Sequence, residues 1–185
     1  MRRWIFVAAA AIAGMLALPV AADLDIGPNP IFTYARNGDT AEVDYLLRKG
    51  TSVQIANSSG ETVLIIAAAN GYLDMVELVL NNRARVDDQD SSGRTALCWA
   101  AERGHDAVVE RLVKAGANIN HQNREGLTPL MFAVRAARAP AVRSLLASRP
   151  DLTLLDYTGR SALGWARGGR DRRIEAILVK AGAKD

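Results

Sequence analysis

The chain has 185 residues, of which 49% are hydrophobic and 23% are charged, and its formal net charge at pH 7 is +3. Basic and acidic side chains nearly balance, so net charge alone is a poor guide to partners. The single cysteine, Cys98, excludes an internal disulfide, and we expect it to be buried as a small hydrophobic residue.

The first 22 residues have the pattern of a secretory signal peptide. Arg2 and Arg3 precede an apolar run from Trp4 to Val20, and small residues follow up to Ala22. We therefore expect residues 1–22 to be a signal peptide, removed before Asp23, and the rest of the chain to be periplasmic. A retained membrane anchor is the alternative, because an apolar run of this length can span a bilayer. In either case the rest of the chain would lie outside the cytoplasm.

The remainder of the chain, residues 23–185, is expected to form one domain of five repeats. Glycines recur every 33 residues, and apolar pairs such as Leu112–Val113 keep the same spacing. The repeats span residues 27–59, 60–92, 93–125, 126–158 and 159–185 and begin at Gly27, Gly60, Gly93, Gly126 and Gly159. Such short units cannot bury an apolar face alone, so this period predicts a stacked array with a continuous core.

Each repeat carries signals for two helices and a turn. A side chain able to cap a helix follows each repeat glycine by two positions: Asn29, Thr62, Thr95, Thr128 and Ser161. Glycines then end the first helix in repeats one to three: Gly38, Gly71 and Gly104. Other residues stand where this glycine, or the one after the second helix, is expected, and less regular helix ends are predicted there: Arg83, Ala137, Arg149 and Arg170. Asp or Asn three residues before a repeat glycine predicts a tight turn that projects as a finger: Asn57, Asp90, Asn123 and Asp156.

The run Gly126–Leu127–Thr128–Pro129–Leu130–Met131–Phe132–Ala133–Val134 resembles the signature of the ankyrin repeat. The resemblance extends from Gly27 to Ala183 and implies an all-α fold, a solenoid of about five helix-turn-helix repeats with β-hairpin-like turns. The histidine of that signature is replaced in every repeat, so its hydrogen bond to the capping threonine is expected to be absent: Phe32, Ile65, Cys98, Met131 and Gly164 stand there.

Proteins of this family usually bind partner proteins through a concave face made of turn tips and first helices. Carried over position by position, that face includes Leu127 among others, and arginine and tyrosine are the residue types that most often anchor interfaces. The predicted partner-binding residues are Arg94, Glu102, Arg103, Arg124, Glu125, Arg135, Tyr157 and Arg160. Trp99, Phe132 and Trp165 share one register position, and we expect them to pack in the core.

The sequence offers no catalytic, cofactor or metal site. His105, His121 and Cys98 do not have the spacing of a metal site, and Asp87–Asp90 lacks the glycine and late glutamate of a calcium loop. No nucleophile elbow, phosphate-binding loop or dinucleotide fingerprint occurs. We therefore expect a non-enzyme without cofactor, and a pocket of converging titratable groups would count against this expectation.

Charge is divided along the predicted solenoid. Residues 23–92 hold 5 basic and 11 acidic side chains, a net of −6, whereas residues 93–185 hold 16 basic and 9 acidic, a net of +7. We expect a monomeric, non-catalytic module that binds a partner protein in the periplasm, and no nucleic acid, because export removes the opportunity. The resemblance leaves two alternatives: an immunity protein that inhibits a toxic effector enzyme delivered to the periplasm, and a stress-defence or scaffold protein.

Overall fold

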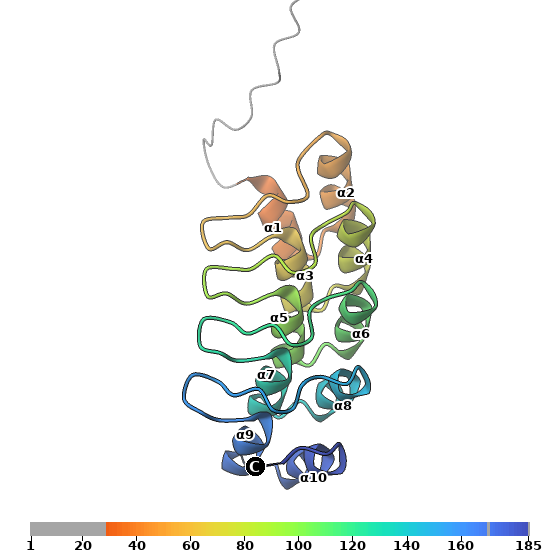
Figure 1. Ribbon diagram of the computed structural model, residues 1–185. Helices are drawn as coiled ribbons and strands as arrows, with labels where there is room; N and C mark the ends of the chain where they lie inside the picture. Colours follow the sequence, from red (N-terminus) through yellow and green to blue (C-terminus); the bar gives the residue numbers. More distant parts are fainter. Residues whose placement is uncertain (1–28, 170, 185) are drawn as a thin grey trace, which may run out of the picture.

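The computed structural model describes residues 29–169 and 171–184, and there the chain is a stack of helix pairs joined by long loops (Figure 1). Those residues contain ten helices and no strand; a single isolated bridge joins Ala56 and Thr62. The expected signal peptide, residues 1–22, lies outside the described residues. Within the described residues, no helix combines the length and the apolar character needed to cross a membrane.

The helices form two layers. The inner layer consists of the first helix of each pair: α1 Pro30–Asn37, α3 Val63–Asn70, α5 Ala96–Arg103, α7 Pro129–Arg135 and α9 Ala162–Gly168. The outer layer consists of the second helices: α2 Thr40–Arg48, α4 Leu73–Asn81, α6 Asp106–Lys114, α8 Ala139–Ala147 and α10 Arg172–Lys180. Each helix packs against its pair partner and against the next helix of its own layer. The all-α solenoid predicted from the sequence is therefore confirmed.

The inner helices begin at the predicted caps. The Thr62 hydroxyl accepts a hydrogen bond from the Ile65 amide at 3.3 Å, and Thr128 and Ser161 accept the corresponding bonds from Met131 at 3.3 Å and Gly164 at 3.0 Å. In each case the side chain satisfies an amide that a helix start leaves without a carbonyl partner. The equivalent acceptors Asn29 and Thr95 cap α1 and α5.

The core fills the space between the two layers and between successive pairs. Leu112 and Leu145 of the outer layer and Leu97 of the inner layer are fully buried. Cys98 is buried as expected, and this burial raises the pKa of its thiol. The Thr95 hydroxyl lies 3.5 Å from the Cys98 sulfur as a hydrogen-bond donor. Repeat three thus keeps a contact between the capping threonine and this position, and the expectation of none is wrong there.

The second helices end at the same register with or without a following glycine, so the predicted irregularity at Arg83 and Arg149 is wrong, whereas α7, which is followed by Ala137, ends one residue earlier than α5, as predicted. These residues have φ angles of 64°, 55° and 55°, the left-handed conformation that Gly104 adopts at 78°. The Arg138 amide still donates to the Ala133 carbonyl at 2.9 Å across the Ala137 turn. The backbone path is therefore set by stacking even where a Cβ atom disfavours it. Arg170 lies outside the described residues.

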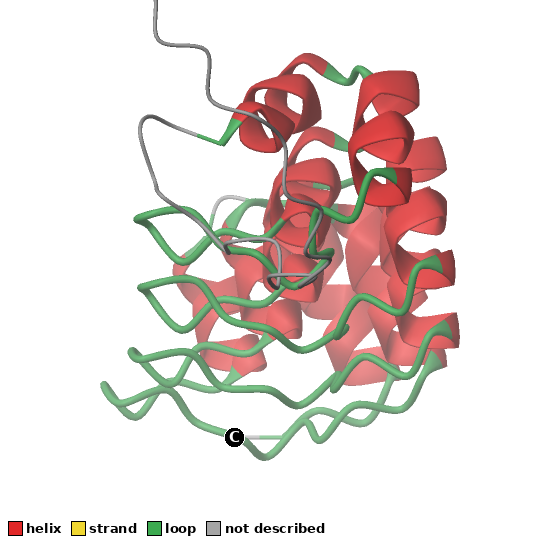
Figure 2. Cartoon of the chain, turned by 90° about the horizontal axis from the view of Figure 1, so that it is seen from above, coloured by secondary structure: helices red, strands yellow, loops and turns green. Residues whose placement is uncertain are grey.

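The loops between pairs project to one side as fingers (Figure 2). In the finger of repeat three, Oδ1 of Asp90 accepts hydrogen bonds from the amides of Ser92 at 2.8 Å and Arg94 at 3.0 Å. The same two-amide pattern recurs at Asn57, Asn123 and Asp156. Backbone hydrogen bonds also join the tips of neighbouring fingers, from Ser91 to Ser59, Arg124 to Ser92 and Tyr157 to Glu125.

Candidate functional site

The surface between the fingers and the inner helices of repeats three to five is here called the concave face. Arginine and aromatic side chains lie close together on it. The fingers place Arg94, Arg124, Tyr157 and Arg160 beside it. The inner helices α5, α7 and α9 supply the remaining members from successive levels of the stack. Segments 33 residues apart in sequence thereby meet on one surface.

Arg94 lies at the centre of this face. Its guanidinium carbon is 3.7 Å from the centre of the Trp99 ring system and 4.2 Å from that of Phe132, so the cation is sandwiched between two aromatic faces. The side chain is only 13% exposed. Among the described residues, its buried Nε has no hydrogen-bond partner. A planar guanidinium is suited to such stacking, which compensates part of the desolvation that burial imposes.

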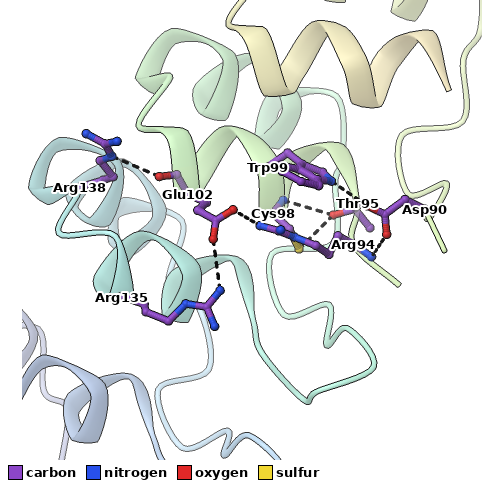
Figure 3. A network of polar contacts seen from close by, with 8 residues as sticks. All are labelled: Asp90, Arg94, Thr95, Cys98, Trp99, Glu102, Arg135 and Arg138. Carbon is purple, nitrogen blue, oxygen red and sulfur yellow. Dashed lines mark hydrogen bonds and ion pairs between the residues drawn. The ribbon is translucent and has the colours of Figure 1, made fainter. Parts of the chain in front are cut away.

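Glu102 joins Arg94 to the next repeat (Figure 3). One carboxylate oxygen accepts a hydrogen bond from Arg94 and the other lies 3.2 Å from Nη2 of Arg135. Partial burial disfavours the charged carboxylate, but the hydrogen bonds and charges of the two arginines outweigh it and hold the pKa of Glu102 below its ordinary value. The Arg138 side chain further binds the Glu102 carbonyl at 3.2 Å.

Guanidinium groups and aromatic rings alternate along the face. Arg103 lies 5.7 Å from the Trp99 ring, Arg135 lies 5.1 Å from Phe132 and 5.9 Å from Trp165, and Arg160 lies 4.9 Å from Trp165. We call this series the arginine–aromatic ladder; in order it is Arg103, Trp99, Arg94, Phe132, Arg135, Trp165 and Arg160. The ladder contains four cations; the Glu102 carboxylate pairs with two of them, and the carboxylates of Asp90 and Asp156 bind the two indoles.

Two aspartates orient the tryptophan side chains by accepting hydrogen bonds from them. The indole Nε1 of Trp99 donates to Oδ2 of Asp90 at 2.8 Å, and that of Trp165 donates to Oδ2 of Asp156 at 2.8 Å. Burial raises the pKa of Asp156, but hydrogen bonds from Thr158, the Arg160 amide and Trp165 outweigh it, and the net pKa is lowered. Each aspartate therefore holds a finger turn with one oxygen and orients a ring with the other.

A hollow of about 350 Å³ adjoins Arg135 and Trp165 of the ladder. Trp165 contributes apolar surface to it, Arg124 and Arg135 contribute cations, and Glu125 and Asp156 contribute carboxylates. The Tyr157 side chain at its edge is 74% exposed, the most exposed large hydrophobic residue described. The lining residues are Arg124, Glu125, Leu127, Arg135, Asp156, Tyr157, Thr158 and Trp165.

The structure brings the eight predicted partner-binding residues onto this one face. Arg94, Arg103, Arg135 and Arg160 are rungs of the ladder and Glu102 lies between two of them; Arg124, Glu125 and Tyr157 line the hollow. Leu127 is 1% exposed, so its assignment to the accessible face is wrong.

The three aromatic residues expected in the core differ in how deeply they are buried. Phe132 is buried, whereas Trp99 and Trp165 are half-buried with one ring face against arginine. Sequence reasoning missed their place in the ladder. A signal was present, because tryptophan occurs only in the repeats whose finger turn has aspartate, Asp90 and Asp156, and not in those with asparagine.

The side chains of the concave face are of the kind that binds other molecules. Glu102 is held ionised by two arginines, which is unlike a carboxylate poised for proton transfer near neutral pH. Among the described residues, no group of three or more histidine, cysteine or acidic side chains could hold a metal ion. His105 binds the Ala69 carbonyl of the preceding repeat at 3.1 Å, and His121 binds the Gly93 carbonyl of its own repeat at 2.7 Å, so both imidazoles have structural partners.

Stacked helix pairs with a finger between them, and side chains presented from equivalent positions, define a helical-repeat protein of the solenoid class. A family model of ankyrin repeats in three copies matches residues 8–90, 31–123 and 97–184, and the chain belongs to the ankyrin-repeat family. Ankyrin repeats indicate a protein–protein interaction module, and proteins built from them are generally non-catalytic. In a comparison with curated proteins, none matches the sequence.

Proposed function

We propose that this protein is a non-catalytic module that binds a partner protein through the ladder and the hollow of its concave face. The observation that carries the proposal is the ladder itself. It combines arginine and tryptophan, which dominate interface hot spots, in a line across three repeats. Arg103, Arg135, Tyr157 and Arg160 keep exposed surface there.

Rigidity favours this use of the face. Asp90 and Asp156 orient the rings, Glu102 holds two of the cations, and backbone hydrogen bonds fix the finger tips. Binding to side chains that are already immobilised loses less conformational entropy than binding to free ones. A face arranged in this way is suited to recognition, because its cations and rings are held in place before a partner binds.

We further propose that binding takes place outside the cytoplasm, in the periplasm. The support is the sequence of residues 1–22, whose arginines, apolar run and small residues match a secretory signal. Residues 23–185 would then act as one exported domain. The identity of the partner separates three forms of this function: a general interaction module, an immunity protein bound to a toxic effector enzyme, and a stress-defence or scaffold protein.

Site-specific photo-crosslinking in the producing cell tests the proposed face. A photoreactive phenylalanine analogue replaces Tyr157 in one variant and Tyr45 in another. Tyr45 is the matched control, because it is a 55% exposed tyrosine on α2 in the outer layer. We expect a protein adduct of one defined mass from position 157 and none from position 45.

Ladder variants complete this test. Arg103→Ala should leave the unfolding midpoint unchanged, because the side chain is exposed, and should reduce the adduct. Recovery of the adduct from the periplasmic fraction supports the proposed location. Equal adducts from positions 45 and 157, or no protein adduct from position 157, would overturn the proposed binding face. An adduct that is a single neighbour-encoded enzyme, inhibited on binding, would identify the immunity form.

A further inference from the structure

Repeats three and five differ at the position that holds Glu102 in repeat three. In repeat three, Glu102 stands nine residues after the repeat glycine and pairs with Arg94, which stands one residue after it. In repeat five the same two positions hold Gly168 and Arg160. The ring between them is a tryptophan in both repeats, Trp99 and Trp165, and both indoles bind an aspartate.

Arg135 of repeat four contacts both of these repeats. It stands nine residues after the glycine of repeat four, directly between Glu102 of repeat three and Gly168 of repeat five in the register. On one side it binds Glu102 at 3.2 Å, and on the other its guanidinium lies 5.9 Å from the Trp165 ring. No carboxylate of the described residues lies within ion-pair distance of Arg160. Two cations therefore flank Trp165, and the carboxylate bound to this ring, that of Asp156, accepts the indole hydrogen and forms no ion pair with either cation.

We infer that the place between Arg135 and Arg160, over the Trp165 ring, binds a carboxylate side chain of the partner protein. The proposal rests on the protein-binding function above and names the chemistry of the partner. This carboxylate would pair with Arg160 of repeat five as Glu102 pairs with Arg94 of repeat three, and with Arg135 of the preceding repeat, whereas Glu102 pairs with Arg135 of the following one. Two guanidinium groups around one carboxylate supply charge-assisted hydrogen bonds, which are roughly twice as strong as neutral ones.

The surroundings favour an Asp or Glu within a continuous acidic segment. Tyr157, the cations of Arg124 and Arg135 and the carboxylates of Glu125 and Asp156 line the hollow beside Trp165, which has room for an apolar side chain next to the bound carboxylate. Residues 93–185 carry a net charge of +7, which attracts an acidic segment over a distance. We therefore expect the partner to present an acidic residue close in sequence to a large apolar one.

Gly168→Glu is the decisive variant. A Cβ atom at Gly168 would meet no atom within 4 Å, and the backbone there needs no left-handed conformation, so the larger residue fits. The introduced carboxylate should pair with Arg135 and Arg160 and compete with the partner. Gly168→Gln is the matched control, because it adds the same bulk without charge. Arg160→Ala removes one of the two cations without changing the helix.

The experiment selects binders from a random peptide display library on the full-length protein and measures their affinity for each variant. We expect selected peptides to contain Asp or Glu near a large apolar residue. Gly168→Glu and Arg160→Ala should each weaken their binding by about tenfold or more, the effect of one charged hydrogen bond. Gly168→Gln should change it less than about threefold. The introduced glutamate should also raise the melting temperature above that of Gly168→Gln at low salt.

Two results would overturn the inference: selection of peptides without acidic residues or of no peptides, and equal effects of Gly168→Glu and Gly168→Gln. Either result leaves the proposed function standing if the adduct from position 157 still forms. Loss of that adduct in the unmodified protein would instead count against the proposed function. If Gly168→Glu does not fold, the comparison of Arg160→Ala with Arg143→Ala decides, since Arg143 lies exposed on α8 in the outer layer.

Discussion

At the scale of single residues, the difference between a carboxylate and an amide explains which repeats carry tryptophan. Asp156 uses Oδ1 to hold the finger turn and Oδ2 to accept the Trp165 indole hydrogen. An asparagine can serve the turn in the same way, as Asn123 does, but its second group is a donor. Repeat four correspondingly has Phe132, which offers no hydrogen, at the position of the indole.

Asp156→Asn should therefore destabilise the protein although the turn is preserved. We expect a loss of about 1–3 kcal/mol in the free energy of unfolding, because the buried indole N–H would face a second donor. Urea denaturation measures it. Trp165→Phe in the Asp156→Asn background should then be nearly neutral, as for interacting neighbours in a double-mutant cycle. Fully additive losses would contradict the pairing.

Glu102 gives the molecule an acid-sensitive contact. Its pKa is lowered in the folded protein from an ordinary value of 4.5 because Arg94 and Arg135 favour the charged form. A lowered carboxyl pKa stabilises the fold above the unfolded-state value and loses this contribution as the pH falls through the folded-state value. The stability difference between the wild type and Glu102→Gln should be constant near neutrality and shrink below about pH 4.5. Denaturation at several pH values tests this, and a constant difference down to pH 3 would contradict it.

The residue-level features differ in how far they were predictable from the sequence. The caps Thr62, Thr128 and Ser161 were predictable because each contact spans three residues and depends on local geometry alone. The sandwich of Arg94 between Trp99 and Phe132 was not, because Phe132 belongs to the next repeat. The contact requires the exact stacking register and side-chain directions, which the 33-residue spacing alone does not define.

At the scale of elements, helix ends show the stack imposing a backbone conformation on residues that disfavour it. Sequence reasoning predicted a less regular end of α7 because Ala137 stands where glycine is expected. Ala137 adopts a φ of 55° all the same, because the Arg138 and Ala137 amides still bond to α7 carbonyls and α8 must follow at a fixed angle. The tertiary contacts of α7 and α8 thus outweigh the local preference of alanine.

Ala137→Gly should stabilise the protein. The left-handed conformation destabilises the folded protein by about 1–2 kcal/mol when the residue is alanine. Glycine removes this strain, but it raises the entropy of the unfolded chain, which lowers stability by about 0.4–1 kcal/mol. We expect a net gain of about 1 kcal/mol in thermal or urea denaturation. Gly104→Ala at the equivalent position of α5 is the control with opposite sign, since its Cβ would lie 2.8 Å from the Arg138 side chain. A loss of stability in Ala137→Gly would refute the strain.

At the scale of the whole molecule, stability comes from contacts between neighbouring repeats. Leu112 on α6 is fully buried, and α6 packs against α5 and against the neighbouring outer helices α4 and α8. Leu112→Ala should lower the free energy of unfolding by about 2–5 kcal/mol, the range for a leucine truncation that leaves a cavity. Urea denaturation followed by circular dichroism measures it. Leu47→Ala, at a half-buried site on α2 near the end of the stack, should have a smaller effect.

The uneven charge of the two halves makes self-association testable. If the acidic residues 23–92 of one molecule bound the basic residues 93–185 of another, low salt would promote assembly and high salt would reverse it. We expect a monomer at both low and high salt, because the ladder arginines Arg94, Arg103 and Arg135 lie on the concave face of repeats three and four and not at an end of the stack. Light scattering gives the mass directly, and a mass that rises at low salt would favour the scaffold form.

The hydrogen bonds between finger tips restrict how such a molecule can change in length during evolution. Ser91 bonds to Ser59, Arg124 to Ser92 and Tyr157 to Glu125, so each tip is aligned by the one before it. Inserting one amino acid into a single finger would misalign both of its neighbours. Duplicating a complete 33-residue unit would recreate every bond at the new junctions. Growth in whole units, each adding the same increment of surface, is the change that this architecture tolerates best.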